Sequence, residues 1–477
     1  ALIGCWLLLA AAAPAATYVV APDGSDQNDG LATSTPFRTV ARGVSALQAG
    51  DTLSLREGVY REYVVLRQAG SNGAPIRIEA YPGEHPVMSG SEVITNWSHV
   101  TNAIWKVEDW PMTPQRVFED GQPLRMVDWP NAYMRQYANY FYTPTNFGVA
   151  GLTNGCFYHD PTNGVLYVWR RDGGSPQDAL MEVAVRPQVL ACATAPAHLA
   201  VSGLIFEHAN SFTYSPGGWQ AVRLEGPTVI SNCAVRWNDA EGLSMRLDVQ
   251  VLDSDISQNG MVGLGFLSNA LVRGCTIISN NNRGFNPFHH AGGMKIHPGA
   301  CPARNAADGV VEGCEIAWNR GYGVWFDYAT GMARRIVRGN YVHDNDAAGI
   351  FLEVTRGGDV YNNVVVSNRG GGIHISHASA TRIWNNTLAG NSGFVDVYYI
   401  VTPRVECDFT TNLLWTRVES NEFFNNVVYD SHCTYDIVIP ANAQQSNLVS
   451  WANRSDHNLF WRPGAAPKLH QSGIGTW

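Results

Sequence analysis

The feature that most constrains the fold of this chain is a motif that recurs along its second half, a pair of polar or small residues followed by a short apolar strand. Several copies lie 20 to 26 residues apart, and two intervals of about 40 residues fit either two coils or one coil with an excursion. The pairs are Asn232-Cys233, Ser254-Asp255, Gly274-Cys275, Gly313-Cys314, Gly339-Asn340, Asn362-Asn363, Asn385-Asn386 and Asn425-Asn426. Such short strands with Gly and Asn corners leave no room for crossover helices, so the period predicts an all-β chain folded as a right-handed parallel β-helix. Asn side chains stacked at one corner can bond to one another along the stack.

Most coils contain a strand that begins with glycine, and the alternation along it sets which residues face inward. The segments Gly323 to Asp327 and Gly349 to Glu353 are two copies in the same register. All inward positions are apolar, which supports this register. They are Leu243, Met245, Leu264, Phe266, Met294, Ile296, Val324, Phe326, Ile350, Leu352, Ile373 and Ile375. The outward positions form two columns, one of Ser244, Gly265, Lys295, Trp325, Phe351 and His374, the other of Arg246, Leu267, His297, Asp327, Glu353 and Ser376.

Asp327 and Glu353 occupy the same outward position in consecutive coils, so we expect one strand spacing, roughly 4.8 Å, between them. A retaining glycosidase uses two carboxyl groups about 5–5.5 Å apart, which makes this pair a candidate nucleophile and acid/base. Like charges on adjacent strands repel each other, and a site that tolerates the repulsion can gain a raised pKa suited to a general acid. A pair of solvated surface acids and a calcium site are the alternatives.

Further residues on or beside the two columns are candidate substrate-binding residues, namely Lys295, His297, Trp325, Phe351, Arg356, His374 and His377. Lys295 and His297 can bind substrate hydroxyls or carboxylates, and either can act as a base. Arg356 follows Glu353 on a turn and can pair with an acid or hold a substrate. The register exposes Trp325 and Phe351, and exposed rings beside acids favour contact with a sugar ring. A solvated lysine, a hydrogen-bonded histidine and a surface arginine are the structural alternatives.

Composition and the first residues indicate an exported protein that does not bind nucleic acid. The net charge is −9, and no basic stripe offsets phosphate repulsion. An apolar run followed by Ala13-Pro14-Ala15 predicts that residues 1–16 are part of a secretory signal peptide. We therefore expect a secreted or periplasmic protein without a transmembrane segment, and favour this over a lipoprotein anchored at Cys5. The other eight cysteines can form disulfides or, like Cys233, stack inward as free thiols.

The repeat and its interruption divide the chain into regions. Residues 17–91 contain the N-terminal cap and first coils, with a capping helix expected from Thr35-Pro36 to Gly50. The repeat is absent from 92–195, which we interpret as an inserted β-rich domain, a small sandwich or barrel. The main β-helix with the candidate site occupies 196–441, and 442–477 form a C-terminal coil or cap.

Several of these segments resemble β-helix glycoside hydrolases, most closely the retaining β-xylosidase family. The strands that end at Asp327 and Glu353 are similar to the family's Trp-x-Asp-Trp and Phe-x-Glu-Val strands, and Lys295 and His297 lie in a similar Gly-Ile-Lys-x-His strand. Val117-Phe-Glu-Asp-Gly-Gln-Pro-Leu and Asp128-Trp-Pro-Asn resemble the inserted β-sandwich of these enzymes. The resemblance implies a pectate-lyase-like solenoid in which Asp327 is the nucleophile and Glu353 the acid/base. Tyr328 in place of Trp, and Thr355 to Gly358 in place of an Asn-His-Gly-Pro-like turn, depart from the family.

Two other functions fit the same residues. A polysaccharide lyase would use Lys295 as the base, with Asp327 and Glu353 holding calcium to neutralise a uronate carboxylate. A non-catalytic adhesin or carbohydrate-binding solenoid would use the fold alone. We expect an oligo- or polysaccharide substrate and a hydrolase that requires no cofactor, with calcium as the option of the lyase. Fucosidase and xylanase are the alternative hydrolase activities on related β-helix scaffolds.

Overall fold

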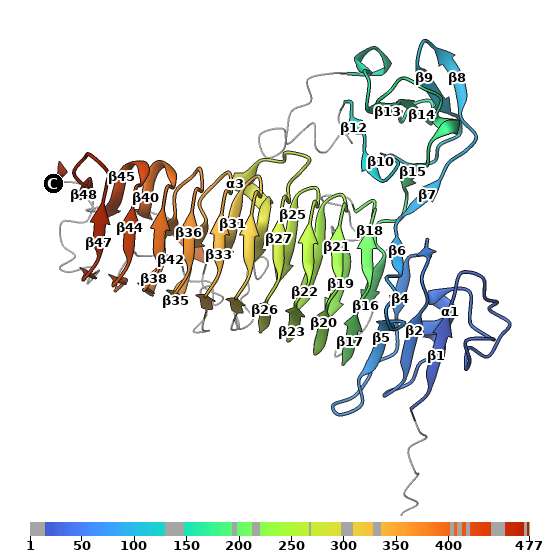
Figure 1. Ribbon diagram of the computed structural model, residues 1–477, viewed down its shortest axis with the longest axis horizontal. Helices are drawn as coiled ribbons and strands as arrows, with labels where there is room; N and C mark the ends of the chain where they lie inside the picture. Colours follow the sequence, from blue (N-terminus) through green and yellow to red (C-terminus); the bar gives the residue numbers. More distant parts are fainter. Residues whose placement is uncertain are drawn as a thin grey trace, which may run out of the picture.

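Three long parallel sheets stacked around one core make up most of the molecule, which confirms the predicted parallel β-helix (Figure 1). The computed structural model describes residues 15–128, 147–192, 198–211, 220–266, 269–296, 309–327, 335–400, 405–407, 413–415, 420–439, 454–471 and 475–476. After the N-terminal helix each coil contributes one strand to each sheet, and we name the sheets A, B and C in the order in which a coil visits them.

The strands of each sheet follow one another from coil to coil. Sheet A contains β1 (Thr17–Val20), β2 (Thr52–Leu55), β5 (Ile76–Ala80), β17 (Leu199–Ser202), β20 (Thr228–Ser231), β23 (Val249–Leu252), β26 (Ala270–Arg273), β29 (Gly309–Glu312), β32 (Arg335–Arg338), β35 (Arg356–Tyr361), β38 (Ser379–Trp384), β43 (Glu422–Phe424) and β46 (Arg454–Asp456). Sheet B contains β3 (Val59–Tyr60), β6 (Val87–Ser89), β18 (Ile205–Glu207), β21 (Ala234–Arg236), β24 (Asp255–Ser257), β27 (Thr276–Ile278), β30 (Glu315–Ala317), β33 (Tyr341–His343), β36 (Val364–Val366), β39 (Thr387–Ala389), β44 (Val427–Tyr429) and β47 (Leu459–Trp461). Sheet C contains β4 (Val64–Leu66), β16 (Leu190–Cys192), β19 (Gln220–Glu225), β22 (Glu241–Arg246), β25 (Val262–Phe266), β28 (Gly292–Ile296), β31 (Tyr322–Asp327), β34 (Ile350–Glu353), β37 (Ile373–Ser376), β40 (Ser392–Ile400), β45 (His432–Ile439), β48 (Leu469–Gln471) and the antiparallel β49 (Gly475–Thr476).

The interior of the coils is a single apolar core. The inward residues expected from the alternation in sheet C lie in it, from Leu243 to Ile375, while the side chain of Phe266 is outside the described residues. Cys233, Cys275 and Cys314 belong to the same core. Within the described residues Cys156, Cys192, Cys233, Cys275 and Cys314 are free and buried, and Cys433 is buried, which supports inward packing as small hydrophobic residues.

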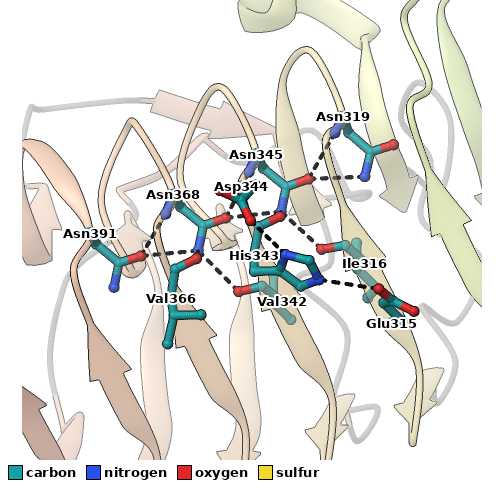
Figure 2. A network of polar contacts seen from close by, with 10 residues as sticks. All are labelled: Glu315, Ile316, Asn319, Val342, His343, Asp344, Asn345, Val366, Asn368 and Asn391. Carbon is teal, nitrogen blue, oxygen red and sulfur yellow. Dashed lines mark hydrogen bonds and ion pairs between the residues drawn. The ribbon is translucent and has the colours of Figure 1, made fainter.

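Two ladders of buried asparagines hold the corners of the coils. At the corner between sheets A and B, both the backbone N–H and the side-chain amide of Asn340 donate to Oδ1 of Asn363, at 3.1 and 3.0 Å. The sequence predicted this stack. A second ladder, between sheets B and C, joins Asn238, Asn259, Asn280, Asn319, Asn345, Asn368 and Asn391. Figure 2 shows the part of it from Asn319 to Asn391. Each amide also donates to a backbone carbonyl, so the polar groups buried at the corners are paired.

A short helix closes the N-terminal end of the core, as predicted, but it begins later than the sequence suggested. Helix α1 spans Val40–Ala46 with Thr39 as its N-cap, and Val40 and Val44 lie in the core. The carboxylate of Asp26 accepts from the backbone N–H groups of Arg38 and Thr39, at 3.0 and 2.9 Å. These bonds keep the residues before Val40 extended, so Thr35 and Pro36 do not start the helix.

The interruption of the repeat corresponds to two small sheets with their own apolar core. One contains β11 (Gln122–Pro123), β10 (Val117–Glu119), β15 (Met181–Ala184) and β7 (Ser91–Val93), and the other β12 (Arg125–Met126), β13 (Cys156–Asp160), β14 (Val165–Trp169), β9 (Ile104–Val107) and β8 (Ser98–Thr101). Phe157, Leu166 and Met181 are central in this core. Figure 1 shows the two sheets as a lobe beside the N-terminal coils. Strand β16 already pairs with β4, so the solenoid resumes within the range that the sequence analysis assigned to the insert.

Polar contacts connect this lobe to the solenoid. Arg116 donates to Oδ1 of Asn282 at 2.6 Å, and the backbone N–H of Gln115 donates to Oδ1 of Asn210 at 2.6 Å. Arg283 forms an ion pair with Asp239 and also bonds to Gln115, at 3.3 Å. Burial lowers the pKa of Arg116 to about 9, because the neighbouring Asp239 offsets only part of the desolvation.

The remaining elements among the described residues are short. They are the helices α3 (Pro287–His290), η2 (Val149–Gly151) and η3 (Pro176–Asp178) and the antiparallel pair β41 (Val405–Cys407) and β42 (Leu413–Trp415). Strands β46, β47 and β48 add a last coil within the expected C-terminal region. The expected signal segment lies outside the described residues except for its last two positions. Among the residues described, no helix is long and apolar enough to cross a membrane.

Candidate active site

Asp327 and Glu353 are directly opposite each other in sheet C. Asp327 is the last residue of β31 and Glu353 the last of β34, and the parallel register pairs them. Neighbouring strands lie roughly 4.8 Å apart, so the two acids share one outer wall at adjacent coils. Gly323 and Gly349 allow this stacking, because a Cβ at Gly323 would come within 2.6 Å of the carbonyl oxygen of Gly349.

Lys295 is the cationic partner of Asp327. Its Nζ lies 2.9 Å from Oδ2 of Asp327 and donates to the carbonyl oxygen of His289 at 2.7 Å. Helix α3, capped by the side chain of Asn286, supplies that carbonyl. The other carboxylate oxygen, Oδ1 of Asp327, is buried and accepts no hydrogen bond from the residues that the structure describes. A buried oxygen without a hydrogen bond costs free energy. A bound molecule that donates to Oδ1 of Asp327 would remove this cost.

Trp325 connects the two acidic positions. It is the register partner of Lys295 on one side and of Phe351 on the other. Nζ of Lys295 lies 3.5 Å from the centre of its ring, and the indole N–H donates to Oε2 of Glu353 at 3.1 Å. Asp327 therefore lies beside an ammonium group, and Glu353 accepts a hydrogen bond from an indole N–H.

The prediction that Trp325 and Phe351 are exposed is wrong. Both point out of the solenoid, but their side chains are only 3% and 6% exposed. They pack with Tyr322, Ala347 and Ala348 in a small apolar cluster on the outer wall. The ring of Tyr322 stacks on Phe351 with centroids 4.7 Å apart and lies 4.8 Å from Trp325. Because of these contacts, the two rings pack beside the acids and are not open to a sugar ring. The alternation along one strand could not predict that Tyr322 covers them.

Two residues of this wall were missed by the sequence analysis, Tyr322 and Glu241. Burial, together with the nearby charge of Glu353, raises the pKa of Tyr322. Burial also raises the pKa of Glu241 to about 8, against the effect of a bond to Gln220. A Cβ at Gly265 would lie 2.1 Å from Oε1 of Glu241, so this carboxyl group leans over the coil next to Lys295. Both residues lie in one register column, one position before the glycine that begins each strand motif. Including that position in the comparison of the repeats would have identified them.

The other candidate residues lie at different depths. His374 is half-buried, with its ring edge-on to Phe351 at 6.4 Å. His377 is buried and its Nδ1 lies 2.7 Å from Oγ of Ser376, the register partner of Glu353. Arg356 is exposed at the start of β35, and its backbone carbonyl accepts a bond from Arg335. His297 lies outside the described residues.

The charges on this wall bear on whether a cation can bind beside Asp327. Among the described residues, no group of three or more His, Cys, Asp or Glu side chains is arranged to hold a metal ion. Lys295 already places a positive charge beside Asp327, and this charge would repel a calcium ion there. A cavity of about 440 Å³ lies elsewhere, on β43 and β46, and is lined by Phe424, Asp456 and His457 among others. It contains neither acid of the pair.

The comparisons with known proteins agree with the fold. The family model of the right-handed β-helix region matches residues 220–392, a range that includes Lys295, Asp327 and Glu353. The uncharacterized protein YwoF of Bacillus subtilis (strain 168) is 42% identical over 74 residues, which is 16% of this chain and 16% of that protein.

Two solved structures match over nearly the whole chain. The structure of XylC in complex with xylose has a TM-score of 0.66 at 16% identity, covering 96% of this chain and 86% of that chain. A structure of a glycoside hydrolase has a TM-score of 0.56 at 13% identity, covering 97% of both chains. At these identities the likeness shows the fold, a right-handed parallel β-helix, and the predicted handedness is confirmed.

Proposed function

We propose that this chain is a retaining glycoside hydrolase, similar to β-xylosidases, with Asp327 as nucleophile and Glu353 as acid/base. The observation that carries the proposal is the register pair itself, two acids on adjacent strands whose backbones are one strand spacing apart, with Lys295 beside Asp327 and the indole N–H of Trp325 bound to Glu353. This spacing is close to the separation of about 5–5.5 Å that a covalent glycosyl-enzyme intermediate requires. The similarity in fold to XylC, solved with xylose, supports a sugar as the substrate.

In the first step, Oδ1 of Asp327 attacks the anomeric carbon as the glycosidic C–O bond breaks. The carboxyl group of Glu353 gives its proton to the leaving oxygen, so the first product departs as an alcohol. Lys295 holds Oδ2 of Asp327 and so fixes the direction of Oδ1. In the second step Glu353 removes a proton from water, which attacks the same carbon and releases Asp327.

The ion pair of Lys295 also favours hydrolysis over β-elimination. A lyase needs an unprotonated base, and an amine that lies 2.9 Å from a buried carboxylate is stabilised as ammonium. The binding-solenoid alternative needs neither the buried Lys295–Asp327 pair nor the unpaired Oδ1 atom.

A mechanism-based inhibitor tests the proposal directly. Incubation with an activated 2-fluoro-β-xyloside should add one glycosyl group to the peptide that contains Asp327, as seen by mass spectrometry. Asp327→Ala should lose hydrolysis of aryl β-xylosides, and azide should restore turnover of Glu353→Ala with activated substrates. EDTA should change none of these results.

A broad panel of aryl glycosides and oligosaccharides should accompany this test, because the sugar is part of the proposal. An unsaturated product that absorbs in the ultraviolet, formed only with calcium, would establish a lyase. Failure of the panel, combined with binding of glycans by Asp327→Asn as strong as by the unmodified chain, would favour a binding solenoid.

A further inference from the structure

A second feature of the solenoid, around Trp318, is not used by the proposed reaction. Trp318 follows β30 at the corner between sheets B and C, and its side chain is 50% exposed. Equivalent corner positions in neighbouring coils are Ser279, Asp344, Ser367 and Gly390, and the N–H of each bonds to the adjacent coil. All five residues have positive φ, and that of Trp318 is 53°.

A tryptophan is an unfavourable choice for this position. The left-handed backbone suits glycine, asparagine or aspartate, and a bulky side chain there is strained. The half-exposed indole also leaves apolar surface in water. The two adjacent coils fill this corner with Ser279 and Asp344, so the fold does not require a ring there, although Trp237 takes the same position, with a φ of 55°, in an earlier coil. Strain at an exposed aromatic residue indicates a functional position.

The side chains around Trp318 contact one another and form an ordered surface. The ring of His343 lies edge-on to Trp318 with centroids 4.9 Å apart and stacks on Tyr341 at 4.0 Å. Tyr341 is itself 46% exposed, whereas His343 is buried. Nδ1 of His343 lies 2.7 Å from Oδ2 of Asp344, and Nε2 lies 3.2 Å from Oε1 of Glu315 (Figure 2). The two carboxylates fix the imidazole, which in turn fixes both exposed rings.

We propose that the surface around Trp318 binds a neutral glycan chain apart from the active site. This surface, the Trp318 surface, consists of Glu315, Trp318, Tyr341, His343 and Asp344. Exposed aromatic rings contact the apolar faces of sugar rings. The carboxylates of Glu315 and Asp344 are each nearly half exposed and retain acceptor sites for sugar hydroxyl groups. The two acids, in a chain of net charge −9, would repel a uronate polymer, so the chemistry favours a neutral glycan.

The Trp318 surface and the candidate active site are on different walls. Glu315, Tyr341 and His343 lie in sheet B, while Asp327 and Glu353 lie in sheet C. Binding here would hold a polymer against the enzyme without contacting the reacting bond. The ligand class rests on the proposed function, but the surface can be tested separately, because different residues carry the two properties.

The test is electrophoresis of the native protein through gels that contain soluble neutral arabinoxylan, with Asp327→Ala present throughout to prevent digestion. The variant is Trp318→Ser, because Ser279 and Ser367 show that serine fits this corner. The matched control is Trp461→Ala, which removes a ring of the same sheet that is 47% exposed and stacks on Tyr429. Trp318→Tyr keeps an aromatic ring and serves as the conservative variant.

We expect Trp318→Ser to weaken retardation by about tenfold in apparent Kd, the loss of roughly one stacking contact. Trp318→Tyr should recover most of it, and Trp461→Ala should match the parent. Gels with polygalacturonate should retard none of the proteins. Equal retardation of the parent and Trp318→Ser, or equal losses in Trp318→Ser and Trp461→Ala, would overturn the proposal, as would stronger retardation by polygalacturonate.

Two further measurements separate this inference from the proposed function. Trp318→Ser with Asp327 intact should hydrolyse small aryl glycosides with unchanged kcat/KM, since it touches no reacting group. Its Tm should stay within a few degrees of the parent, because the side chain is on the surface. Loss of glycoside hydrolysis on Asp327→Ala with intact retardation would support both sites. Retardation lost on Trp318→Ser in a chain that hydrolyses no glycoside would support the Trp318 surface alone.

Discussion

The indole N–H of Trp325 donates a 3.1 Å hydrogen bond to Oε2 of Glu353 on the next coil of the solenoid. The same ring lies under the ammonium group of Lys295, which pairs with Asp327. One buried aromatic side chain therefore contacts Glu353 directly and Asp327 through Lys295. The consequences can be measured with substitutions that change one contact at a time.

Trp325→Phe should move one limb of the pH–rate profile. Phenylalanine keeps a ring under Lys295 but removes the donor to Glu353, so the charged carboxylate is less stabilised. The limb that reports Glu353 should shift to higher pH by about 0.5–1 unit, the value of one net hydrogen bond. The measurement is kcat/KM of an aryl glycoside against pH. Trp384→Phe, on sheet A, is the control and should leave the limb in place. A limb unmoved in Trp325→Phe would show that this bond does not tune the acid.

Lys295→Met should destabilise the fold and abolish most activity. It leaves the carboxylate of Asp327 buried without its cation, which costs about 3–5 kcal/mol in the free energy of unfolding. Urea unfolding measures the loss. Adding Asp327→Asn should restore most of the stability, since neither charge then remains, but no activity. Lys106→Met removes the exposed pair with Glu108 and should cost less than about 1 kcal/mol. Equal costs for the two lysines would contradict a buried ion pair.

Glu241→Gln should change how stability depends on pH. Burial raises the pKa of Glu241 from 4.5 to about 8, so the folded chain keeps a proton that the unfolded chain releases. The stability due to this group is therefore complete below pH 4.5 and is lost as the pH rises toward 8, by about 1.4 kcal/mol per pH unit. Glutamine mimics the protonated form and should flatten this slope. Unfolding in urea between pH 4 and 9 tests the prediction, with exposed Glu108→Gln as control. Parallel curves for the parent and Glu241→Gln would refute it.

Asn345→Ala should lower the free energy of unfolding much more than Asp346→Ala does. The side chain of Asn345 accepts from both N–H donors of Asn319, at 3.2 and 2.9 Å, and donates to the carbonyl of Ile316 at 3.0 Å (Figure 2). Removing it leaves buried donors unpaired, at a cost of about 2–4 kcal/mol. Asp346→Ala, which removes an exposed pair with Arg369, should cost less than about 1 kcal/mol. A Tm for Asn345→Ala close to that of Asp346→Ala would mean that water replaces the amide.

The repeat in the sequence predicted the parts of the structure that repeat. The inward column, the corner at Asn340 and Asn363, and the pairing of Asp327 with Glu353 all follow from one period. The alternation could not predict that Tyr322 covers Trp325 and Phe351, nor that α3 brings the His289 carbonyl to Lys295. It likewise missed the second asparagine ladder, because Asn319 and Asn345 follow Trp318 and Asp344, which share no residue type.

The sequence by itself determined the solenoid and the neighbouring positions of Asp327 and Glu353. In stacked coils every residue meets its equivalent one period later, so local alternation and register are enough to pair them. Only the tertiary structure decided what surrounds the acids, namely the Lys295 ion pair, the Trp325 hydrogen bond and the leaning carboxyl group of Glu241. These contacts depend on how outward side chains and an excursion fold back over the wall. That arrangement does not repeat from coil to coil. The burial of these side chains, which raises the pKa of Glu241, therefore depends on tertiary packing.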